Sequence, residues 1–183
     1  MSKQTVFADP LAQKTGDDAA TPTRVLFVCT GNTCRSPMAA AVLNDRAAPR
    51  EICTACAEQS AETGRYVAFS AGLYAAQGAP ITPHAAEALR EAGIVCTPSN
   101  DYEAHRAHTV TAEDVANADM VVAITTKHAM ELLMRFPDAA SKIRTLPMDI
   151  ADPFGGTLAT YRECLMQLRY CLQIAFGEAG GTP

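Results

Sequence analysis

The sequence has no tryptophan, few charged residues and no long apolar segment. Charged residues make up 19% of the chain, below the roughly 25% of a typical globular protein. No apolar run approaches the roughly 20 residues that a membrane-spanning helix needs. Residues 1–10 also lack the continuous apolar segment of a secretion signal. We therefore expect a cytoplasmic protein that does not enter a membrane.

Positive charge is scarce as well. Fifteen lysines and arginines face 20 aspartates and glutamates, which gives a formal net charge of −5. Nucleic acids and anionic membranes attract basic surfaces, so we expect neither as a partner. Hydrophobic residues make up 48% of the 183 residues, enough to bury the core of one domain. We assign residues 1–23 to a flexible arm, 24–178 to the domain and 179–183 to a tail.

The seven cysteines form an odd set. Secreted disulfide scaffolds usually have an even number in a shorter chain, so we interpret these residues as reduced thiols. Cys53 and Cys56 form a single CxxC pair with no second pair at ligand spacing, and we expect no metal site. Cys164 and Cys171 are expected in the last helix, with their side chains in the protein core. His105 and His108 are interpreted as hydrogen-bonding loop residues rather than metal ligands.

Short apolar strands alternate with helical segments along the chain. Strands are expected at 24–28, 66–70, 119–124 and 143–146, and helices at 36–48, 82–92, 111–118, 125–135 and 158–175. The last helix has an apolar stripe at helical spacing, formed by Leu158, Tyr161, Leu165, Leu168, Leu172 and Ala175. Such alternation predicts an α/β fold, a parallel sheet with helices on both faces. Ligands of such folds bind at the carboxyl ends of the strands.

The polar segment from Cys29 to Arg35, here called the Cys29 loop, follows the first expected strand. It contains Gly31 and precedes Ser36 and Pro37, which we interpret as the N-cap and first residue of a helix. Backbone N–H groups of such a loop and the helix N-terminus together favour an anion. Arg35 adds a planar fork of donors. The segment therefore predicts a binding site for a tetrahedral oxyanion.

The same positive surroundings favour a thiolate at Cys29. Ser36 is placed to donate a hydrogen bond to that sulfur. Attack on phosphorus would give a phosphocysteine, which water then hydrolyses. Asp152 is the candidate general acid, which would protonate the leaving atom and then deprotonate the attacking water. An inert buried cysteine, and an ordinary turn at 152–156, are the alternative interpretations.

Two stretches resemble the low-molecular-weight protein tyrosine phosphatase family. Residues 28–39 are similar to its phosphate loop and 152–154 to its general-acid loop, within a resemblance that covers roughly residues 24–178. It implies a four-stranded parallel sheet of the Rossmann-like or flavodoxin-like kind, without metal or cofactor. It also implies that Cys29 is the nucleophile, Arg35 the phosphate clamp and Asp152 the acid. The substrate-binding residues implied are Thr30, Gly31, Asn32, Thr33, Cys34, Ser36, Tyr74 and Phe154.

Within that family the chain is most similar to the bacterial protein-arginine phosphatases. These carry threonine, here Thr33, where tyrosine-specific members usually carry isoleucine or leucine, and their acid loop matches residues 152–156. The implied substrate is phosphoarginine in proteins, with Phe154 and Tyr74 as pocket walls, and we expect a monomer. The resemblance also suggests a reversible disulfide between Cys34 and Cys29. A buried, inert Cys34 is the alternative.

Three other functions are considered. The first is a phosphatase specific for phosphotyrosine. The second is an arsenate reductase on the same scaffold, which needs a downstream cysteine pair. Cys96 is isolated between Cys56 and Cys164, so no suitable pair is visible. The third is a non-catalytic phosphate-binding module, which would lack a nucleophile or an acid. Segments 1–23, 49–65 and 97–104 exceed the compact family pattern. The second and third flank expected active-site elements and therefore bear on substrate preference.

Overall fold

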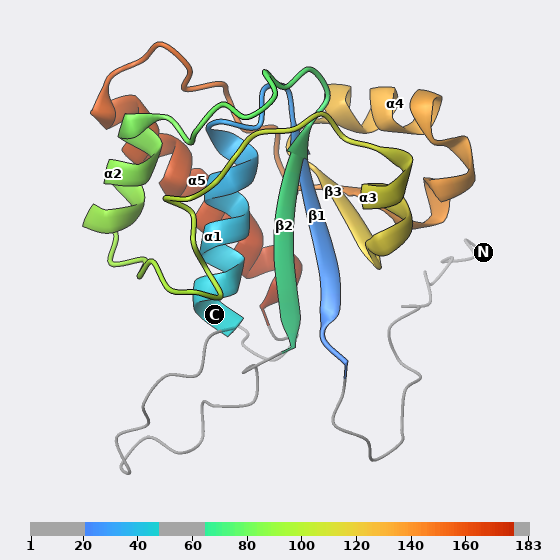
Figure 1. Cartoon of the computed structure of the whole chain (residues 1–183), viewed down its shortest axis with the longest axis horizontal. Helices are drawn as coiled ribbons and strands as arrows, with labels where there is room; N and C mark the ends of the chain where they lie inside the picture. Colours follow the sequence, from blue (N-terminus) through green and yellow to red (C-terminus); the bar gives the residue numbers. More distant parts are fainter. Residues whose placement is uncertain (1–20, 48–64, 178–183) are drawn as a thin grey trace, which may run out of the picture.

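The structure is a computed structural model that describes residues 21–47 and 65–177. The strands are β1 (Thr23–Cys29), β2 (Tyr66–Gly72), β3 (Met120–Ala123) and β4 (Ile143–Thr145). The helices are α1 (Arg35–Ala47), α2 (Pro83–Glu91), α3 (Ala112–Asn117), α4 (Thr126–Arg135) and α5 (Leu158–Phe176), with a 3₁₀ helix at Pro137–Lys142 (Figure 1). Most of the expected arm, the expected tail, and Cys53 with Cys56 lie outside the described residues.

The four strands form one parallel sheet in the order β2-β1-β3-β4. β1 is central: it pairs with β2 along its whole length and with β3 from Val25 to Val28. A central strand of a parallel sheet is buried on both faces, which explains its continuous apolar run. Cys29 is the last residue of β1 and therefore lies at the carboxyl edge of the sheet.

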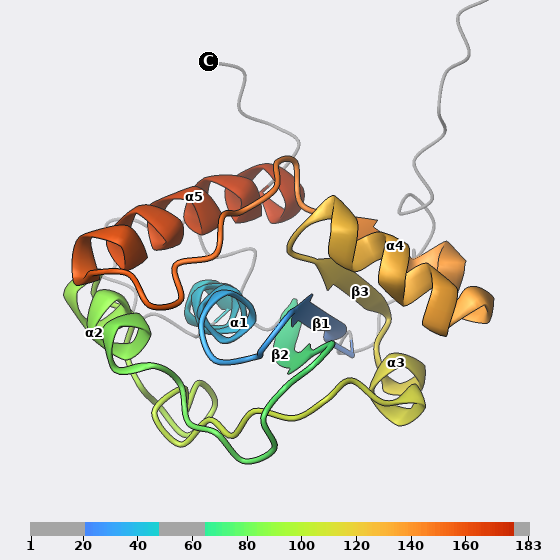
Figure 2. The ribbon, with the colours of Figure 1, turned by 90° about the horizontal axis from the view of Figure 1, so that it is seen from above.

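Helices cover both faces of this sheet, as predicted (Figure 2). Val25 and Phe27 of β1 point into a core formed with α1, α2 and α5. Leu26 and Val28 point into a second core with α3 and α4. Because successive side chains of a strand point to opposite faces, one apolar run supplies both cores. The predicted fold class is confirmed.

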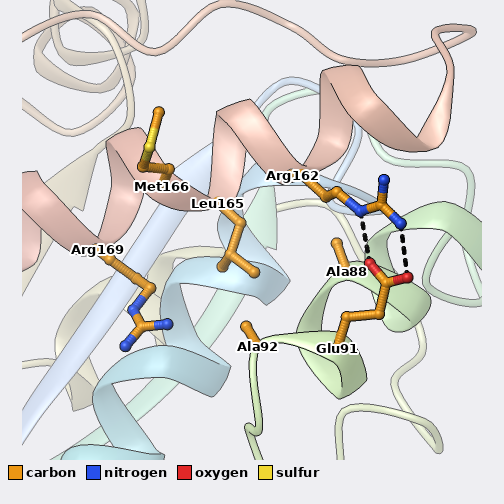
Figure 3. Close-up of a pocket in the computed structure, with 7 residues that line it drawn as sticks. All are labelled: Ala88, Glu91, Ala92, Arg162, Leu165, Met166 and Arg169. Atoms are coloured by element: carbon orange, nitrogen blue, oxygen red, sulfur yellow. Dashed lines mark hydrogen bonds and ion pairs between the residues drawn. The ribbon is translucent and has the colours of Figure 1, made fainter.

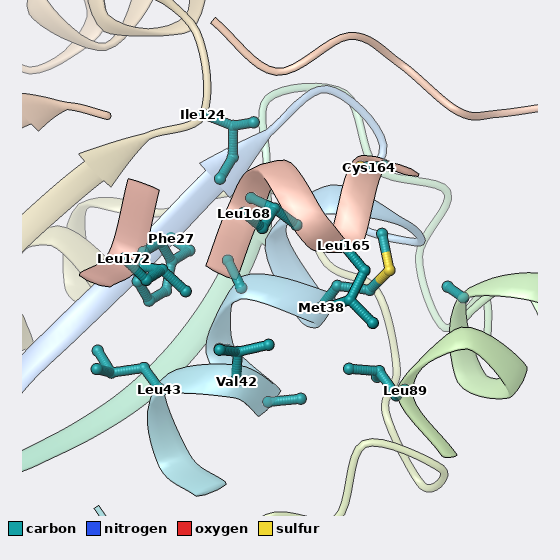
Figure 4. Close-up of a cluster of buried hydrophobic side chains, with 14 of the residues drawn as sticks. Phe27, Met38, Val42, Leu43, Leu89, Ile124, Cys164, Leu165, Leu168 and Leu172 are labelled. Carbon is teal, nitrogen blue, oxygen red and sulfur yellow. The ribbon is translucent and has the colours of Figure 1, made fainter. Parts of the chain in front are cut away.

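The apolar stripe of α5 packs against β1 and α1. Leu165, Leu168 and Leu172 are buried next to Phe27 and α1 (Figure 4). The prediction was wrong at Ala175, which is exposed. Phe176 is buried in its place, and its ring centroid lies 6.1 Å from that of Phe27. Residues 175 and 176 both border the stripe, and the larger side chain occupies the core.

One further difference concerns the start of α1. The prediction that Ser36 is an N-cap was wrong, because α1 begins at Arg35 and places Ser36 in its first turn. α2 is expected at 82–92 and is found at Pro83–Glu91; Gly93 follows it, with a left-handed φ of 76° and its N–H bonded to the Arg90 carbonyl. Within the described ranges, no helix combines the length and apolar character required to cross a bilayer.

Candidate active site

The Cys29 loop connects the end of β1 to the start of α1 at the carboxyl edge of the sheet. Asn32 in its middle has a left-handed φ of 56°, the one positive φ outside glycine in the described part of the chain. Such a conformation costs roughly 1–2 kcal/mol for a residue with a side chain. It turns the backbone so that the Asn32 N–H donates a hydrogen bond to Cys29 Sγ, 3.3 Å away. The loop therefore curls around the sulfur.

The Asn32 side chain is fully buried and holds this conformation. Its Nδ2 donates to Ser36 Oγ (3.0 Å) and Ser70 Oγ (2.9 Å), and its Oδ1 accepts from the His108 N–H. The Asn32 carbonyl accepts from His105 Nε2 at 2.7 Å. Burial lowers the pKa of His105, which favours the neutral ring. The loop roles predicted for both histidines are confirmed.

Cys29 is almost completely buried, and its sulfur has a second hydrogen-bond partner. Ser36 Oγ lies 3.0 Å from Cys29 Sγ. Ser36 already accepts a hydrogen bond from Asn32, so its own hydrogen goes either to the sulfur or to the Ala71 carbonyl, 3.2 Å away. An ionised sulfur attracts that hydrogen more strongly than a neutral carbonyl does. The arrangement can therefore stabilise a thiolate.

Arg35 joins two loops that are far apart in the sequence. Its Nη2 donates to Asp152 Oδ2 (2.5 Å) and to Thr30 Oγ1 (3.3 Å), and its Nη1 donates to the Ile150 carbonyl (3.2 Å). The side chain is 6% exposed. Its Nε is buried and has no protein partner among the described residues. The guanidinium thus keeps donor capacity beside the Cys29 loop.

Asp152 remains accessible in this arrangement. Its side chain is 49% exposed, and its Oδ1 accepts a hydrogen bond from the Phe154 N–H at 3.2 Å. Asp149, in the same loop, accepts from both the N–H (2.7 Å) and the hydroxyl (2.9 Å) of Thr126. The loop is therefore fixed to α4 on one side and to Arg35 on the other, while the carboxylate can reach a ligand.

Two exposed aromatic rings lie on the segments next to the loop. Tyr74 is 65% exposed, and its N–H bonds to the Thr30 carbonyl. The Arg135 guanidinium lies 4.7 Å from the centre of the Tyr74 ring, which restricts the ring by a cation–π contact. Phe154, two residues after Asp152, is 71% exposed. Both rings are available for contact with a substrate.

Residues 30–34 divide between an open and a buried side. Thr30 is exposed, and Gly31 and Thr33 are partly exposed. Cys34 is buried, with Sγ 3.4 Å from the Tyr161 hydroxyl and 3.5 Å from Thr82 Oγ1. Burial and the bond to Cys34 raise the pKa of Tyr161 to about 12, so this hydroxyl stays protonated. The Cys34 side chain therefore contacts Tyr161 of α5 and Thr82, the residue that precedes α2.

One residue of this site was missed by sequence reasoning. His128, in the first turn of α4, is buried, and its Nε2 lies 2.9 Å from Thr30 Oγ1. Burial, together with the nearby charge of Arg35, lowers the pKa of His128 to about 4. The available signal was positional: α4 follows β3, whose carboxyl end lies at the same edge of the sheet as that of β1.

A separate hollow of about 430 Å³ lies between α2 and α5 (Figure 3). Arg162 donates two hydrogen bonds to Glu91 there, 2.6 and 2.7 Å long, and Leu165 contributes apolar surface. The described residues that line it include no cysteine, serine or histidine. In the described ranges there is also no cluster of three or more metal-ligating side chains. The chemically equipped site is the one around Cys29.

Comparisons with known proteins show to which family the chain is similar. Residues 24–175 match the family model described as low molecular weight phosphotyrosine protein phosphatase. A protein-arginine-phosphatase of Geobacillus stearothermophilus is 40% identical over 154 residues, which cover 80% of this chain and 89% of that protein. A low molecular weight protein-tyrosine-phosphatase, PtpB, of Staphylococcus haemolyticus is 29% identical over 154 residues, 81% of this chain and 94% of that protein.

A solved structure shares the fold. It is a mutant of the YwlE arginine phosphatase with a phosphorylated active-site serine, 33% identical to this chain with a TM-score of 0.65. The match covers 82% of this chain and 91% of that one.

Proposed function

The chain belongs to the low molecular weight phosphotyrosine protein phosphatase family, and on that premise we propose that it hydrolyses phosphoarginine in proteins through a phosphocysteine at Cys29. One observation carries the proposal: the buried Arg35 guanidinium contacts both the Cys29 loop and the exposed carboxylate of Asp152. Arg35 therefore connects the loop that carries the proposed nucleophile to the proposed acid, although Arg35 and Asp152 are 117 positions apart.

In the first step, the Cys29 thiolate attacks phosphorus and an S–P bond forms. The bond from phosphorus to the leaving nitrogen breaks, and the protonated carboxyl of Asp152 gives its proton to that nitrogen. Arg35 and the backbone N–H groups of the loop stabilise the charge on the equatorial oxygens. The Ser36 hydroxyl and the Asn32 N–H, both bonded to Cys29 Sγ, hold the sulfur for attack.

In the second step, water attacks the phosphocysteine. The Asp152 carboxylate, now ionised, takes a proton from that water, and the S–P bond breaks to release phosphate. The electron pair returns to Cys29, where Ser36 stabilises the leaving thiolate by its hydrogen bond. Each step is thus assisted by the same carboxyl group in its opposite protonation state, and the enzyme returns to its starting form.

Two features support phosphoarginine as the substrate. The first is Thr33, a small residue on the open side of the loop, where a larger aliphatic side chain would narrow the site. The second is the 40% identity to a relative named protein-arginine-phosphatase. The guanidino group of phosphoarginine can also hydrogen-bond to the Asp152 carboxyl before its leaving nitrogen accepts the proton. Phosphotyrosine is the second candidate, favoured by the 29% identity to a protein-tyrosine-phosphatase.

The described cysteines disfavour arsenate reduction. Cys164 and Cys171 are buried in α5, and Cys96 is exposed with its thiol 3.4 Å from Asp101. Among the described residues, no cysteine pair downstream of Cys34 is placed to relay electrons to the active-site Cys29. A regulatory disulfide between Cys29 and Cys34, a cytoplasmic location and a monomeric state remain predictions from the sequence.

Hydrolysis of phosphoarginine, phosphotyrosine and p-nitrophenyl phosphate by the native protein and by Cys29→Ser tests the function. We expect Cys29→Ser to lower kcat by roughly 10⁴ or more, since a nucleophile and its partners act as a unit. Cys96→Ala, at an exposed thiol away from the site, is the matched control and should keep full activity. Activity that survives in Cys29→Ser would refute the mechanism.

Thr33→Ile tests the substrate preference separately. If Thr33 sets the width of the site, this change should lower kcat/KM for phosphoarginine relative to phosphotyrosine, by roughly the 10–200-fold that one or two methylene groups provide. Similar ratios in both proteins would remove Thr33 from the argument. A strong preference of the native protein for phosphotyrosine would replace the arginine assignment and leave the chemistry intact.

A further inference from the structure

α4 carries a buried histidine that contacts the open side of the Cys29 loop. His128 is 5% exposed, and its backbone N–H donates to Oγ1 of Thr125, the N-cap residue of the helix. This cap fixes the first turn of α4 and with it the position of the ring. His128 Nε2 lies 2.9 Å from Thr30 Oγ1, and the same oxygen lies 3.3 Å from Arg35 Nη2. Imidazole, hydroxyl and guanidinium thus form a chain that ends at the phosphate clamp.

The protonation state of the ring follows from its surroundings. Burial and the positive charge of Arg35 lower the pKa of His128 to about 4, and the carboxylates of Asp152, Glu131 and Asp149 oppose this only in part. The ring is therefore neutral near pH 7 and has one N–H. Nδ1 is buried with no protein partner among the described residues. A buried N–H without an acceptor is rarer than an unused acceptor, which assigns the hydrogen to Nε2.

With the hydrogen on Nε2, Thr30 Oγ1 accepts two hydrogen bonds, one from His128 and one from Arg35. A hydroxyl oxygen has two acceptor positions and one donor hydrogen, so its acceptor capacity is filled. Its hydrogen is then left for a third group on the exposed side of Thr30. Without His128, the hydroxyl could rotate and donate to other acceptors, water among them. The histidine removes that freedom.

We propose that His128 is a positioning residue, which orients the Thr30 hydroxyl as a donor to the transferring phosphoryl group and steadies the Arg35 guanidinium beside it. This rests on the proposed phosphatase function but does not depend on which phosphorylated side chain is the substrate. It also accounts for the unpartnered Nδ1. An apolar side chain would fill the same space without leaving a buried polar atom unsatisfied, so packing alone does not explain a histidine there.

Substitutions at both ends of the bond test the proposal, with p-nitrophenyl phosphate as substrate and inorganic phosphate as competitive inhibitor. His128→Leu removes the donor and should lower kcat/KM roughly tenfold and weaken phosphate inhibition by a similar factor, as expected for a hydrogen bond that supports a charged group. His128→Gln keeps an N–H near the position of Nε2 and should restore most of the loss. Thr30→Val should match His128→Leu, and Thr30→Ser, which keeps the hydroxyl, should recover most of the loss seen in Thr30→Val.

The double variant His128→Leu with Thr30→Val decides between positioning and packing. If the two residues act through one bond, the double variant should be no more impaired than Thr30→Val alone. The proposal would be overturned if the losses of the two single variants multiplied in the double variant. It would also be overturned by a loss in His128→Gln equal to that in His128→Leu, or by full activity in His128→Leu. Thr30 is exposed, so its variants keep the test valid even if His128→Leu lowers the unfolding temperature. Failure of the proposed function would appear separately, as no hydrolysis by the native protein, and failure of its mechanism as activity that survives in Cys29→Ser.

Discussion

Asp152 has two hydrogen-bond partners that it would have to give up if it acts as the proposed general acid. Its Oδ2 accepts from Arg35 and its Oδ1 from the Phe154 N–H. A phosphoryl group bound by Arg35 would compete for the same guanidinium N–H groups. Its arrival would therefore release one carboxylate oxygen at the moment when a proton is needed on the leaving atom. Under the proposed mechanism, the Arg35–Asp152 hydrogen bond would thus couple substrate binding to proton delivery.

Replacing Asp152 by asparagine removes the proton and keeps the shape. We expect kcat with phosphoarginine to fall roughly 10²–10⁴-fold, the usual contribution of a general acid. p-Nitrophenolate leaves with little need for a proton, so its release should suffer much less. Steady-state kinetics with both substrates measures the ratio. Equal losses would mean that Asp152 acts by holding Arg35 rather than as an acid.

Residue identities at the site could be predicted where the pattern is local. Cys29, Arg35 and Ser36 lie within one loop and one helical turn, so strand, glycine and helix start were enough to group them. His128 could not be found this way, because 98 positions separate it from Thr30 and a single histidine in a helix has no spacing to recognise. The prediction that Ser36 is the N-cap of α1 was wrong, because its hydroxyl contacts Cys29 Sγ instead of capping the helix.

At the scale of elements, the end of β2 lies against the Cys29 loop. A Cβ added at Gly72 would come within 2.7 Å of the Thr30 carbonyl oxygen and 3.0 Å of the Asn32 backbone nitrogen. Both are backbone atoms of the loop, so they cannot rotate away. Glycine at the last position of β2 therefore allows the strand and the loop to approach as closely as they do.

Gly72→Ala should displace the loop and lower kcat/KM by roughly 10²-fold, since small misplacements of reacting groups are costly. The free energy of unfolding should fall by about 1–3 kcal/mol. Gly78→Ala is a matched control: its φ of 79° strains alanine, but nothing lies within 4 Å of the added Cβ. It should lose stability by about 1–2 kcal/mol and keep its activity. Equal kinetics in both variants would contradict the close approach at Gly72.

The buried face of α5 gives the protein a pH-dependent stability. Burial raises the pKa of the Cys164 thiol from 9.0 to about 12. In the unfolded chain this thiol ionises near pH 9, whereas in the folded protein it stays neutral. The stabilisation is therefore complete below pH 9 and is lost as the pH rises from about 9 to about 12, by at most about 1.4 kcal/mol per pH unit for one group.

Urea unfolding at a series of pH values tests this effect. Cys164→Ala should lose less stability than the native protein between pH 9 and 10, where Tyr161, with a pKa of about 12 against 10.0 when unfolded, contributes little. Cys96→Ala, at an exposed thiol, should follow the native curve. Parallel curves for Cys164→Ala and the native protein would show that Cys164 is not the group concerned.

Element types were predictable from period and flanking residues, whereas several boundaries were not. The apolar run of β1 and the stripe of α5 are long enough to identify, and both are found as predicted. The 3₁₀ helix at Pro137–Lys142 was not predicted, because it buries no side chain and so has no apolar period. At the end of the stripe Phe176 is buried instead of Ala175, because the larger side chain fills the core, and hydrophobic periodicity carries no information on side-chain size.

At the scale of the whole molecule, the site closes the carboxyl edge of the sheet, and an anion bound there should stabilise the native state. Phosphate at 100 times its Kd would add about 2.7 kcal/mol. For a chain of this size that raises the unfolding temperature by roughly 5–10 °C. Thermal unfolding with increasing phosphate measures the shift. The local positive groups of the site, rather than the net charge of −5, govern this binding.

Arg35→Ala should abolish this shift, because it removes the clamp. Arg162→Ala is the matched control: it removes a surface guanidinium paired with Glu91, away from the Cys29 loop, and should keep the full shift. A shift that persists in Arg35→Ala, or vanishes in Arg162→Ala, would place the anion elsewhere on the molecule.

The long separation between Cys29 on β1 and Asp152 along the chain has a consequence for synthesis on the ribosome. The nucleophile lies on the first strand of the sheet, whereas Asp152 follows Arg35 by 117 positions. At roughly 5–20 residues per second, translation separates them by about 6–23 s. During that interval a nascent chain contains Cys29 and Arg35 but not the acid that completes the reaction. Catalytic competence therefore begins only near the end of synthesis, when the loop at 149–156 and α5 have emerged.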